Sequence, residues 1–145
     1  DPTAVKLPRT LLGEDSLDFS FSGIKTAVLY KWRGMNAVHE DKAPDAPSPE
    51  DLCASFQAAV FDVLAEKIRR ASRQEDLHTV VLGGGVTANK TLRQGLADRL
   101  RPDYTLVFPP PRFTTVNAAM IGARALRQLA RGDVADLELM AQAQP

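Results

Sequence analysis

The sequence is poor in the residue types that most often carry disulfide, metal or nucleophile chemistry. Its one cysteine, Cys53, excludes an internal disulfide and is typical of a reducing compartment, so we expect a cytoplasmic protein. The two histidines, His39 and His78, are far apart in the sequence. Two isolated histidines predict neither a metal cage nor a catalytic triad.

Long apolar runs and an excess of one charge are also missing. No stretch of about 18 apolar residues could span a membrane, and no basic-then-apolar leader opens the sequence, so we expect no membrane partner. The 18 Lys and Arg residues balance 18 Asp and Glu residues, so no strong overall field would attract a polyanion. Nucleic acid could therefore bind only at a local patch, or at a patch completed by another chain.

The composition is nevertheless that of a folded unit. A chain of 145 residues has the length of one domain or lobe, and 44% hydrophobic residues are enough for a core. The opening, DPTAVKLPRT, begins with Asp1 and reads like the middle of a connection. We therefore expect residues 1–145 to form one lobe of a longer protein.

The stretch DFSFSGIK predicts a change from strand to helix. On an extended segment, Phe19 and Phe21 lie on one face and the serines on the other. We expect a short strand over residues 18–22 and then a helix over about 23–33, with Ser22 as its N-cap.

A long amphipathic helix is predicted after a polar, proline-bearing segment. Residues 34–47 are expected to be a flexible surface loop. Ser48 is a good N-cap, Pro49 suits the first helical position, and the helix should run to about Ala71. One stripe at helical period is expected to face the core, formed by Leu52, Phe56, Val60, Val63, Leu64 and Ile68.

Two further features of this helix are predicted. Cys53 lies beside the apolar stripe and is expected to be a buried, inert thiol. Lys67, Arg69 and Arg70 are expected to stabilise the negative C-terminal end of the helix.

The second half predicts alternating strands and helices. The expected elements are a buried strand HTVVLGGG, a helix VTANKTLRQGLADRL, a strand YTLVFPPP, and a helix capped by Thr114 or Thr115 that ends at Gly132, before a tail over 133–145. The whole order is strand, helix, helix, strand, helix, strand, helix, which is typical of an α/β layer with a largely parallel sheet.

The triple glycine is the most specific candidate site. In α/β sheets, ligands bind beyond the carboxyl ends of the strands. Gly83, Gly84 and Gly85 would let backbone approach a flat or anionic ligand, and Asn89, one turn into the helix, could both donate and accept hydrogen bonds. A tight structural turn with an asparagine on the helix face explains the pattern about as well. The spacing fits neither GxGxxG nor a P-loop.

The second candidate is PPPRFTTVNAAMIGARAL. The prolines would deliver the chain to a helix start that holds Thr114, Thr115 and Asn117. Small residues at Ala118, Ala119, Gly122 and Ala123 would let this helix pack closely against a neighbour, so a purely structural role is favoured. Ordinary solvated charges are expected at Lys25, Lys31, Arg33, Lys90 and Arg93, although some could meet phosphate.

Four motifs in order resemble one family. DFSFSGIKTAV, DLCASFQAAVFDVLAEK, VVLGGGVTANKTLR and PPPRFTTVNAAMIGA resemble the TsaD family, also called Gcp or YgjD and formerly O-sialoglycoprotein endopeptidase. The resemblance runs from about Leu7 to Leu129 and covers the C-terminal portion of such proteins. It implies a lobe of the actin-like, sugar-kinase-like ATPase (ribonuclease H-like) fold, with a mixed sheet flanked by helices.

The resemblance also implies site residues. GGGVTAN would form the adenosine side of the site, with Gly83, Gly84, Gly85 and Asn89 as substrate-binding residues, and NAAMIGA would connect two lobes. Further cleft contacts would come from Ser22, Gly23, Lys25, Thr115 and Asn117. Catalytic residues are not assigned.

The activity implied by the resemblance is tRNA modification. In this family the threonylcarbamoyl group of threonylcarbamoyl-AMP passes to N6 of the adenosine beside the anticodon. The implied partners are tRNA and proteins of the TsaB and TsaE types, the first a degenerate actin-like protein and the second a small ATPase.

The family's metal site is where this sequence departs from the pattern. The implied metal is one divalent ion, iron or zinc, held mainly by an H-x-x-x-H pair that this sequence lacks. Val116 stands where the family has an aspartate ligand, and valine cannot ligate a metal. We therefore expect the chain alone to bind no catalytic metal and to be inactive.

Two alternatives stay open from the sequence. One is another enzyme of the same superfamily, either a carbamoyltransferase of the hydrogenase-maturation type or a sugar kinase. The other is a non-catalytic nucleotide-binding or scaffold partner, which the valine at position 116 favours.

Overall fold

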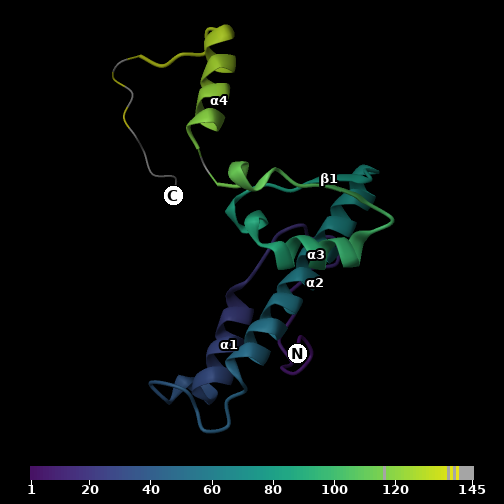
Figure 1. Cartoon of the computed structure of the whole chain (residues 1–145), viewed down its shortest axis with the longest axis vertical. Coiled ribbons are helices and arrows are strands. Elements are labelled where there is room, and N and C mark those ends of the chain that lie inside the picture. Colours follow the sequence, from purple (N-terminus) through teal and green to yellow (C-terminus); the bar gives the residue numbers. More distant parts are fainter. Residues whose placement is uncertain (116, 137, 139, 141–145) are drawn as a thin grey trace.

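The computed structural model describes residues 1–115, 117–136, 138 and 140. Its regular elements are the helices α1 (Ser22–Arg33), α2 (Pro49–Glu75), α3 (Lys90–Leu100) and α4 (Ala118–Ala130), the strands β1 (Thr79–Val81) and β2 (Thr105–Val107), and the short 3₁₀ turns η1 (Met35–Ala37), η2 (Gly85–Ala88) and η3 (Pro111–Phe113). Figure 1 shows α2 running through the middle of the body, with α1 beside its first half and α3 crossing its second half.

The long helix α2 begins as its sequence predicts. The Ser48 side chain accepts a hydrogen bond from the Asp51 backbone N–H at 3.1 Å, and Pro49 occupies the first turn. The helix ends at Asp76, a left-handed residue whose N–H bonds back to the carbonyl of Ser72. It extends to Glu75, one turn beyond the expected end.

Two apolar cores lie along α2. The first joins α1 and the N-terminal segment to the first half of α2, through the buried residues Val5, Leu7, Ile24, Leu52 and Ala59. The second joins the other half of α2 to α3 and the strands, through Phe61, Ala65, Leu92, Leu96, Leu100 and Leu106. The predicted stripe therefore serves both cores, since Phe56 packs on the first and Leu64 and Ile68 on the second.

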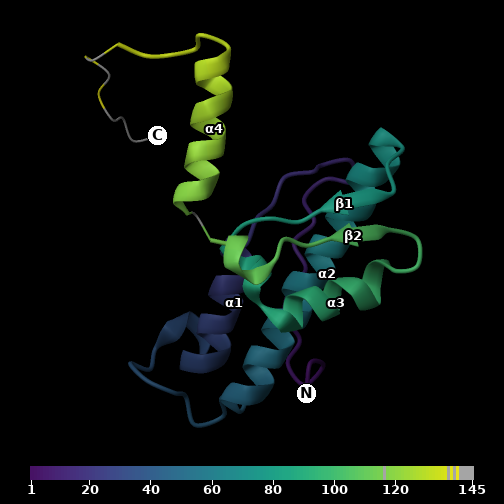
Figure 2. The same cartoon turned by 45° about the horizontal axis from the view of Figure 1, so that its top comes forward.

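The two strands pair in parallel, with Val80 opposite Leu106 (Figure 2). This pair agrees with the α/β class and with a parallel sheet, and it is the whole sheet of the described residues. The expectation of a buried first strand is wrong, because Thr79 and Val81 are exposed, Val81 at 76%. One edge of β1 has no neighbouring strand in the part of the chain that is described.

The expected strand at residues 18–22 is also wrong. Residues 18–21 form no regular structure, and Ser22 is already the first residue of α1, whose N-cap is Phe21 without a side-chain bond. An extended segment becomes a strand only with a ladder partner, and no described strand pairs with it. The same-face prediction is confirmed, because the rings of Phe19 and Phe21 stack with centroids 6.0 Å apart.

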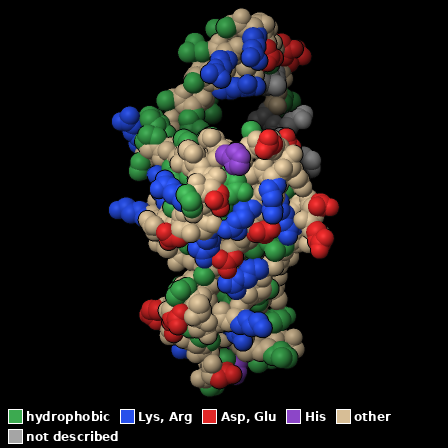
Figure 3. All heavy atoms as spheres, turned by 90° about the vertical axis from the view of Figure 1, so that its right-hand side faces the viewer, with side chains coloured by type: hydrophobic (Ala, Val, Ile, Leu, Met, Phe, Trp, Pro, Cys, Tyr) green, Lys and Arg blue, Asp and Glu red, His purple; other side chains and the backbone are tan. Residues whose placement is uncertain are grey.

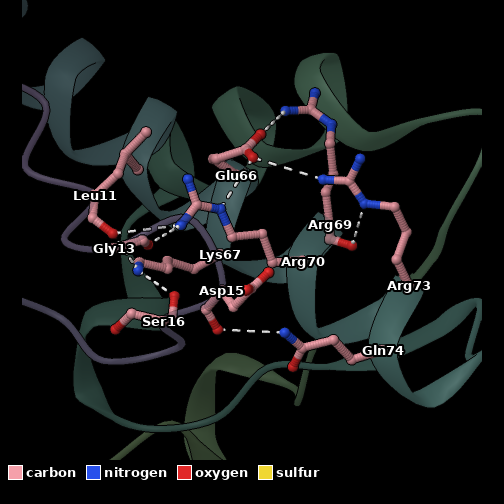
Figure 4. Close-up of polar contacts among 10 residues, drawn as sticks. All are labelled: Leu11, Gly13, Asp15, Ser16, Glu66, Lys67, Arg69, Arg70, Arg73 and Gln74. Carbon is pink, nitrogen blue, oxygen red and sulfur yellow. Dashed lines mark hydrogen bonds and ion pairs between the residues drawn. The ribbon is translucent and has the colours of Figure 1, made fainter.

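The prediction that Lys67 stabilises the C-terminal end of the helix is wrong, because α2 continues to Glu75 and Lys67 binds elsewhere. Its side chain is 2% exposed, and its Nζ donates to the carbonyls of Leu11, at 2.5 Å, and Ser16. Figure 4 shows the neighbouring side chains of α2 doing the same, with Arg70 donating to Gly13 and Gln74 to Asp15. Lys67, Arg70 and Gln74 thus hold the 11–16 loop to α2 through its backbone carbonyls.

Cys53 and α4 give two more corrections. Cys53 is exposed, because it lies to one side of the stripe that faces α1. No residue of α4 is buried, and its small residues Ala118, Ala119, Gly122 and Ala123 are exposed. Figures 1 and 2 show α4 projecting from the body. No described helix is both long enough and apolar enough to cross a membrane.

Candidate functional site

The chain after β1 forms an exposed corner built on glycine. Gly84 has a φ of +90°, which only glycine adopts without strain. Buried Thr87 closes the corner, because its N–H and its hydroxyl both donate to the Gly84 carbonyl, at 3.0 and 2.7 Å. Gly83 and Gly85 are exposed as well, so the backbone at this corner is accessible to a ligand.

Asn89 lies at the start of α3 rather than one turn into it. The 3₁₀ turn η2 takes the preceding residues, so Asn89 becomes the N-cap, and its Oδ1 accepts from the Leu92 N–H at 3.1 Å. Its Nδ2 has no acceptor among the described residues, and the residue is exposed. The helix thus uses the Asn89 oxygen and leaves its Nδ2 donor exposed.

Arg93 is not the solvated charge that was predicted. It is half-buried, its Nε donates to the Thr87 carbonyl at 2.5 Å, and a terminal nitrogen donates to the Pro109 carbonyl at 2.9 Å. Its guanidinium lies 5.1 Å from the centre of the Phe108 ring. The sequence could have indicated this position for Arg93. A residue four after the N-cap lies on the same helix face as the cap, and its side chain points back toward the N-terminus.

The turn after β2 approaches the glycine corner. A β-carbon placed on Gly85 would lie 3.9 Å from Cγ2 of Thr115. Asn117, not Thr114 or Thr115, is the N-cap of α4, and its Oδ1 accepts from the Met120 N–H at 3.2 Å. The Thr114 hydroxyl is used inside η3 instead, donating to the Pro111 carbonyl at 2.8 Å.

An apolar groove of about 450 Å³ runs from the corner to α1. Its lining includes Gly83 at one end and Phe21 and Lys25 at the other, so the DFSFSGIK and GGG motifs meet along one surface. The remaining lining residues are mostly apolar and come from α2, α3 and the segment between β1 and α3: Phe56, Val60, Leu64, Ile68, Leu82, Val86, Thr87, Leu92 and Leu96.

Two predicted cleft residues lie away from this groove. Ser22 and Gly23 are exposed and do not line it. Gly23 instead faces Thr10, whose Oγ1 would lie 3.5 Å from a β-carbon placed there. The structure thus places Lys25 and Gly83 along one groove and Thr115 near Gly85, and it uses Asn117 as a cap.

The charged groups of the body form ion pairs away from the corner. Burial acts to raise the pKa of the Asp62 carboxyl, but the hydrogen bonds and charges of Arg99 and Arg9 outweigh it and hold the pKa below its ordinary value of 3.8. The distances are 2.8 Å to Arg99 and 2.9 Å to Arg9. Figure 3 shows acidic and basic side chains interspersed on the face of the molecule that it draws.

The described residues do not fit a metal. Nowhere in ranges 1–115 and 117–136 do three His, Cys, Asp or Glu residues come together as a metal-binding group. Near the corner the side-chain oxygens of Asn89 and Asn117 each accept from a backbone N–H, and the Thr87 hydroxyl donates to the Gly84 carbonyl. Val116, the predicted departure from the family's ligand set, lies outside the described residues.

The fold and the glycine corner together indicate a class of ligand-binding protein. A glycine corner at the carboxyl end of a parallel strand, followed by a helix N-terminus, is the ligand-binding arrangement of open α/β proteins. Residues 1–123 match the model of one such family, "TsaD: tRNA N6-adenosine threonylcarbamoyltransferase", and the chain belongs to this family.

Similar curated proteins carry the same name. The tRNA N6-adenosine threonylcarbamoyltransferase of Trichlorobacter lovleyi is 47% identical over 148 aligned positions, covering 98% of this chain and 40% of the relative. Those of Latilactobacillus sakei and Geobacillus kaustophilus are each 44% identical, over 92% and 94% of this chain. The chain spans about 40% of the length of these relatives.

Proposed function

We propose that this chain supplies the adenylate-binding part of an enzyme that transfers threonylcarbamoyl from threonylcarbamoyl-AMP to N6 of the adenosine beside the anticodon in tRNA. Family membership supports the reaction class. The exposed glycine corner with the Asn89 nitrogen beside it is the observation in this chain that supports its part in the reaction.

Catalysis of this reaction depends above all on positioning the amine against the carbamoyl carbon. The N6 amine attacks the carbamoyl carbon, a C–N bond forms, the C–O bond to phosphate breaks, AMP leaves, and the amine loses a proton to water. Backbone N–H groups at Gly83 to Gly85 and the Asn89 Nδ2 would donate to the adenylate. The apolar groove would hold a flat base, and Lys25 in its lining would favour a phosphate.

We further propose that residues 1–145 are one lobe of a two-lobed, actin-like protein. The unpaired edge of β1, the uncovered groove beside it and the bare apolar side of α4 support this, because each is a surface that a larger sheet or a second lobe would cover. The flexibility of residues 34–47 and the separate tail at 133–145 stay part of this proposal.

Metal and partners would come from outside this chain. We propose that a divalent iron or zinc ion is held by residues of the other lobe, since the described residues offer no ligand set. The 145-residue chain alone should then be inactive. Its partners would be tRNA and proteins of the TsaB and TsaE types, acting in the cytoplasm.

Position 89 offers a sharp test, because the two roles of its amide can be separated. Asn89→Asp and Asn89→Ser both keep an oxygen that can cap α3, but both remove the Nδ2 donor. In the protein as its gene encodes it, assembled with its partners, both variants should unfold at the wild-type urea concentration. Both should transfer labelled threonylcarbamoyl to tRNA at least about tenfold more slowly, as expected for a lost hydrogen bond to a charged ligand.

If both variants transferred threonylcarbamoyl at the wild-type rate, Asn89 would not be part of the adenylate-binding site. A wild-type protein that phosphorylates sugars with ATP and leaves tRNA unmodified would contradict the proposed reaction itself. If Val116→Asp raises tRNA modification, the departure at that position weakens the enzyme. If that substitution has no effect and the wild type is inactive, a scaffold is the better description.

A further inference from the structure

Arg93 joins the two loops that leave the carboxyl ends of the strands. One of its bonds goes to Thr87, in the loop after β1, and the other to Pro109, in the loop after β2. The guanidinium lies 5.1 Å from the centre of the Phe108 ring. A planar guanidinium holds its donors in a fixed fork, whereas the lysine ammonium is a point charge on a flexible stem.

The connection continues from Thr87 to the glycine corner. Thr87 holds Gly84 through two hydrogen bonds, so a chain of hydrogen bonds runs from Pro109 through Arg93 and Thr87 to Gly84. Gly85 and Thr115, which belong to the same two loops, lie near each other.

The fold has other supports at this place. The register of β1 and β2 is held by backbone bonds, including Leu82 N–H to the Val107 carbonyl at 3.0 Å. Helix α3 has its own cap in Asn89 and its own buried residues in Leu92 and Leu96. Removing the Arg93 side chain therefore leaves strands, cap and core intact and releases only the two loops.

We propose that Arg93 is a positioning residue that fixes the glycine corner against the Pro109–Thr115 turn, so that both present a single surface to the adenylate. The proposal rests on the proposed function and deepens it. Arg93 itself touches loop carbonyls rather than ligand, so its effect on the ligand is indirect. Its loss should weaken adenylate binding and leave tRNA binding alone.

The test compares Arg93→Met and Arg93→Lys with Arg101→Met in the protein as its gene encodes it, together with its partners. Arg101 is an exposed arginine just past α3, with no side-chain hydrogen bond among the described residues. We expect Arg93→Met to raise the KM for threonylcarbamoyl-AMP about tenfold, in line with lost charge-assisted bonds, with the KM for tRNA within about twofold of wild type. Arg93→Lys should recover part of the loss, and Arg101→Met should match the wild type.

Hydrogen exchange gives a second measurement that needs no activity. In Arg93→Met, the hydrogen-bonded backbone amides of Thr87 and Asn89 and those of Phe113 and Thr114 should exchange faster together, while those in 92–100 keep their wild-type rates. Unchanged exchange in either loop overturns the proposal, and so does a KM for tRNA that rises as much as the KM for the adenylate. Failure of Arg93→Met to fold overturns it as well, since Arg93 would then be a determinant of the fold.

The two failures are distinguishable. If the wild type does not modify tRNA but the two loops loosen together in Arg93→Met, the positioning role stands and the proposed reaction falls. If the wild type modifies tRNA and the loops do not loosen, the reaction stands and the positioning role falls.

Discussion

Helices α2 and α4 are both amphipathic, yet the structure uses them in opposite ways. Eight residues of α2 are buried, and the helix joins two cores. No residue of α4 is buried, and its large apolar side chains Ile121, Leu126 and Leu129 are each more than 60% exposed. An amphipathic pattern therefore predicts which face of a helix is suited to burial. It does not show whether the chain itself supplies the surface against which that face packs.

The largest expected difference between the body and α4 concerns leucines. Leu96 on α3 is fully buried against α2, so Leu96→Ala should lower the free energy of unfolding by about 2–5 kcal/mol. Leu126→Ala on α4 should change it by less than about 0.5 kcal/mol, because Leu126 is 68% exposed. Urea denaturation of the 145-residue chain checks both. Equal losses at the two sites would mean that α4 is packed after all.

Glycines sharpen the same comparison. A β-carbon on Gly95 of α3 would lie 2.5 Å from a ring carbon of buried Phe61, so Gly95→Ala should destabilise the chain by about 1–3 kcal/mol. Nothing lies within 4 Å of a β-carbon on Gly122 of α4, so Gly122→Ala should stabilise it by about 0.5–1 kcal/mol, through helix propensity.

Thermal unfolding of the two variants measures these signs. In the protein as its gene encodes it, Gly122→Ala should lose that gain if a second lobe covers α4 closely. A Gly95→Ala variant as stable as the wild type would show that α2 and α3 do not approach as described.

The ion pair of Asp62 predicts a smaller, pH-dependent effect on the body. Because its folded pKa lies below its unfolded value, the stability that it contributes is present above the unfolded pKa and is lost as pH falls through the folded pKa. Asp62→Asn should therefore cost less than about 1 kcal/mol near pH 7, and the difference from wild type should vanish in acid.

Asp98→Asn is the matched control for the loss of a carboxylate without an ion pair. Asp98 is an exposed carboxylate on α3 that accepts a bond from the neutral amide of Gln94 at 2.6 Å. Its replacement should change the free energy of unfolding near pH 7 by less than about 0.5 kcal/mol. A pH-independent loss at Asp62→Asn would mean that the ion pair contributes nothing in the folded state.

The smallest expected effect is at Cys53, where the sequence predicted a buried thiol. Because it is exposed, the thiol should react with a thiol reagent while the chain stays folded, without loss of structure. Far-ultraviolet circular dichroism before and after labelling checks the second point. Reaction only after urea is added would restore the original prediction.

Local signals in the sequence were enough for most helices. Ser48 with Pro49 placed the start of α2 at its residue, because capping is a contact within one turn. Lys67 and Cys53 were misjudged, since their burial depends on the 11–16 loop and on the exact rotation of α2 about the stripe. Neither of those is a local property.

The candidate site was predictable in part for the same reason. The glycines and Asn89 could be predicted as candidates, because turns and helix caps depend on residues that are consecutive in the sequence. Arg93 was missed, since its partners Thr87 and Pro109 come from two loops that meet only when β1 and β2 pair. The strand at residues 18–22 was overpredicted, because alternation gives a face but not a neighbour.

The most direct measurement is a crystal structure of the complete protein bound to a non-hydrolysable analogue of threonylcarbamoyl-AMP. We predict that the adenylate lies against the backbone of Gly83, Gly84 and Gly85, with a ligand atom within hydrogen-bond distance of the Asn89 nitrogen. An analogue bound elsewhere, with the corner buried beneath another part of the protein, would contradict that prediction.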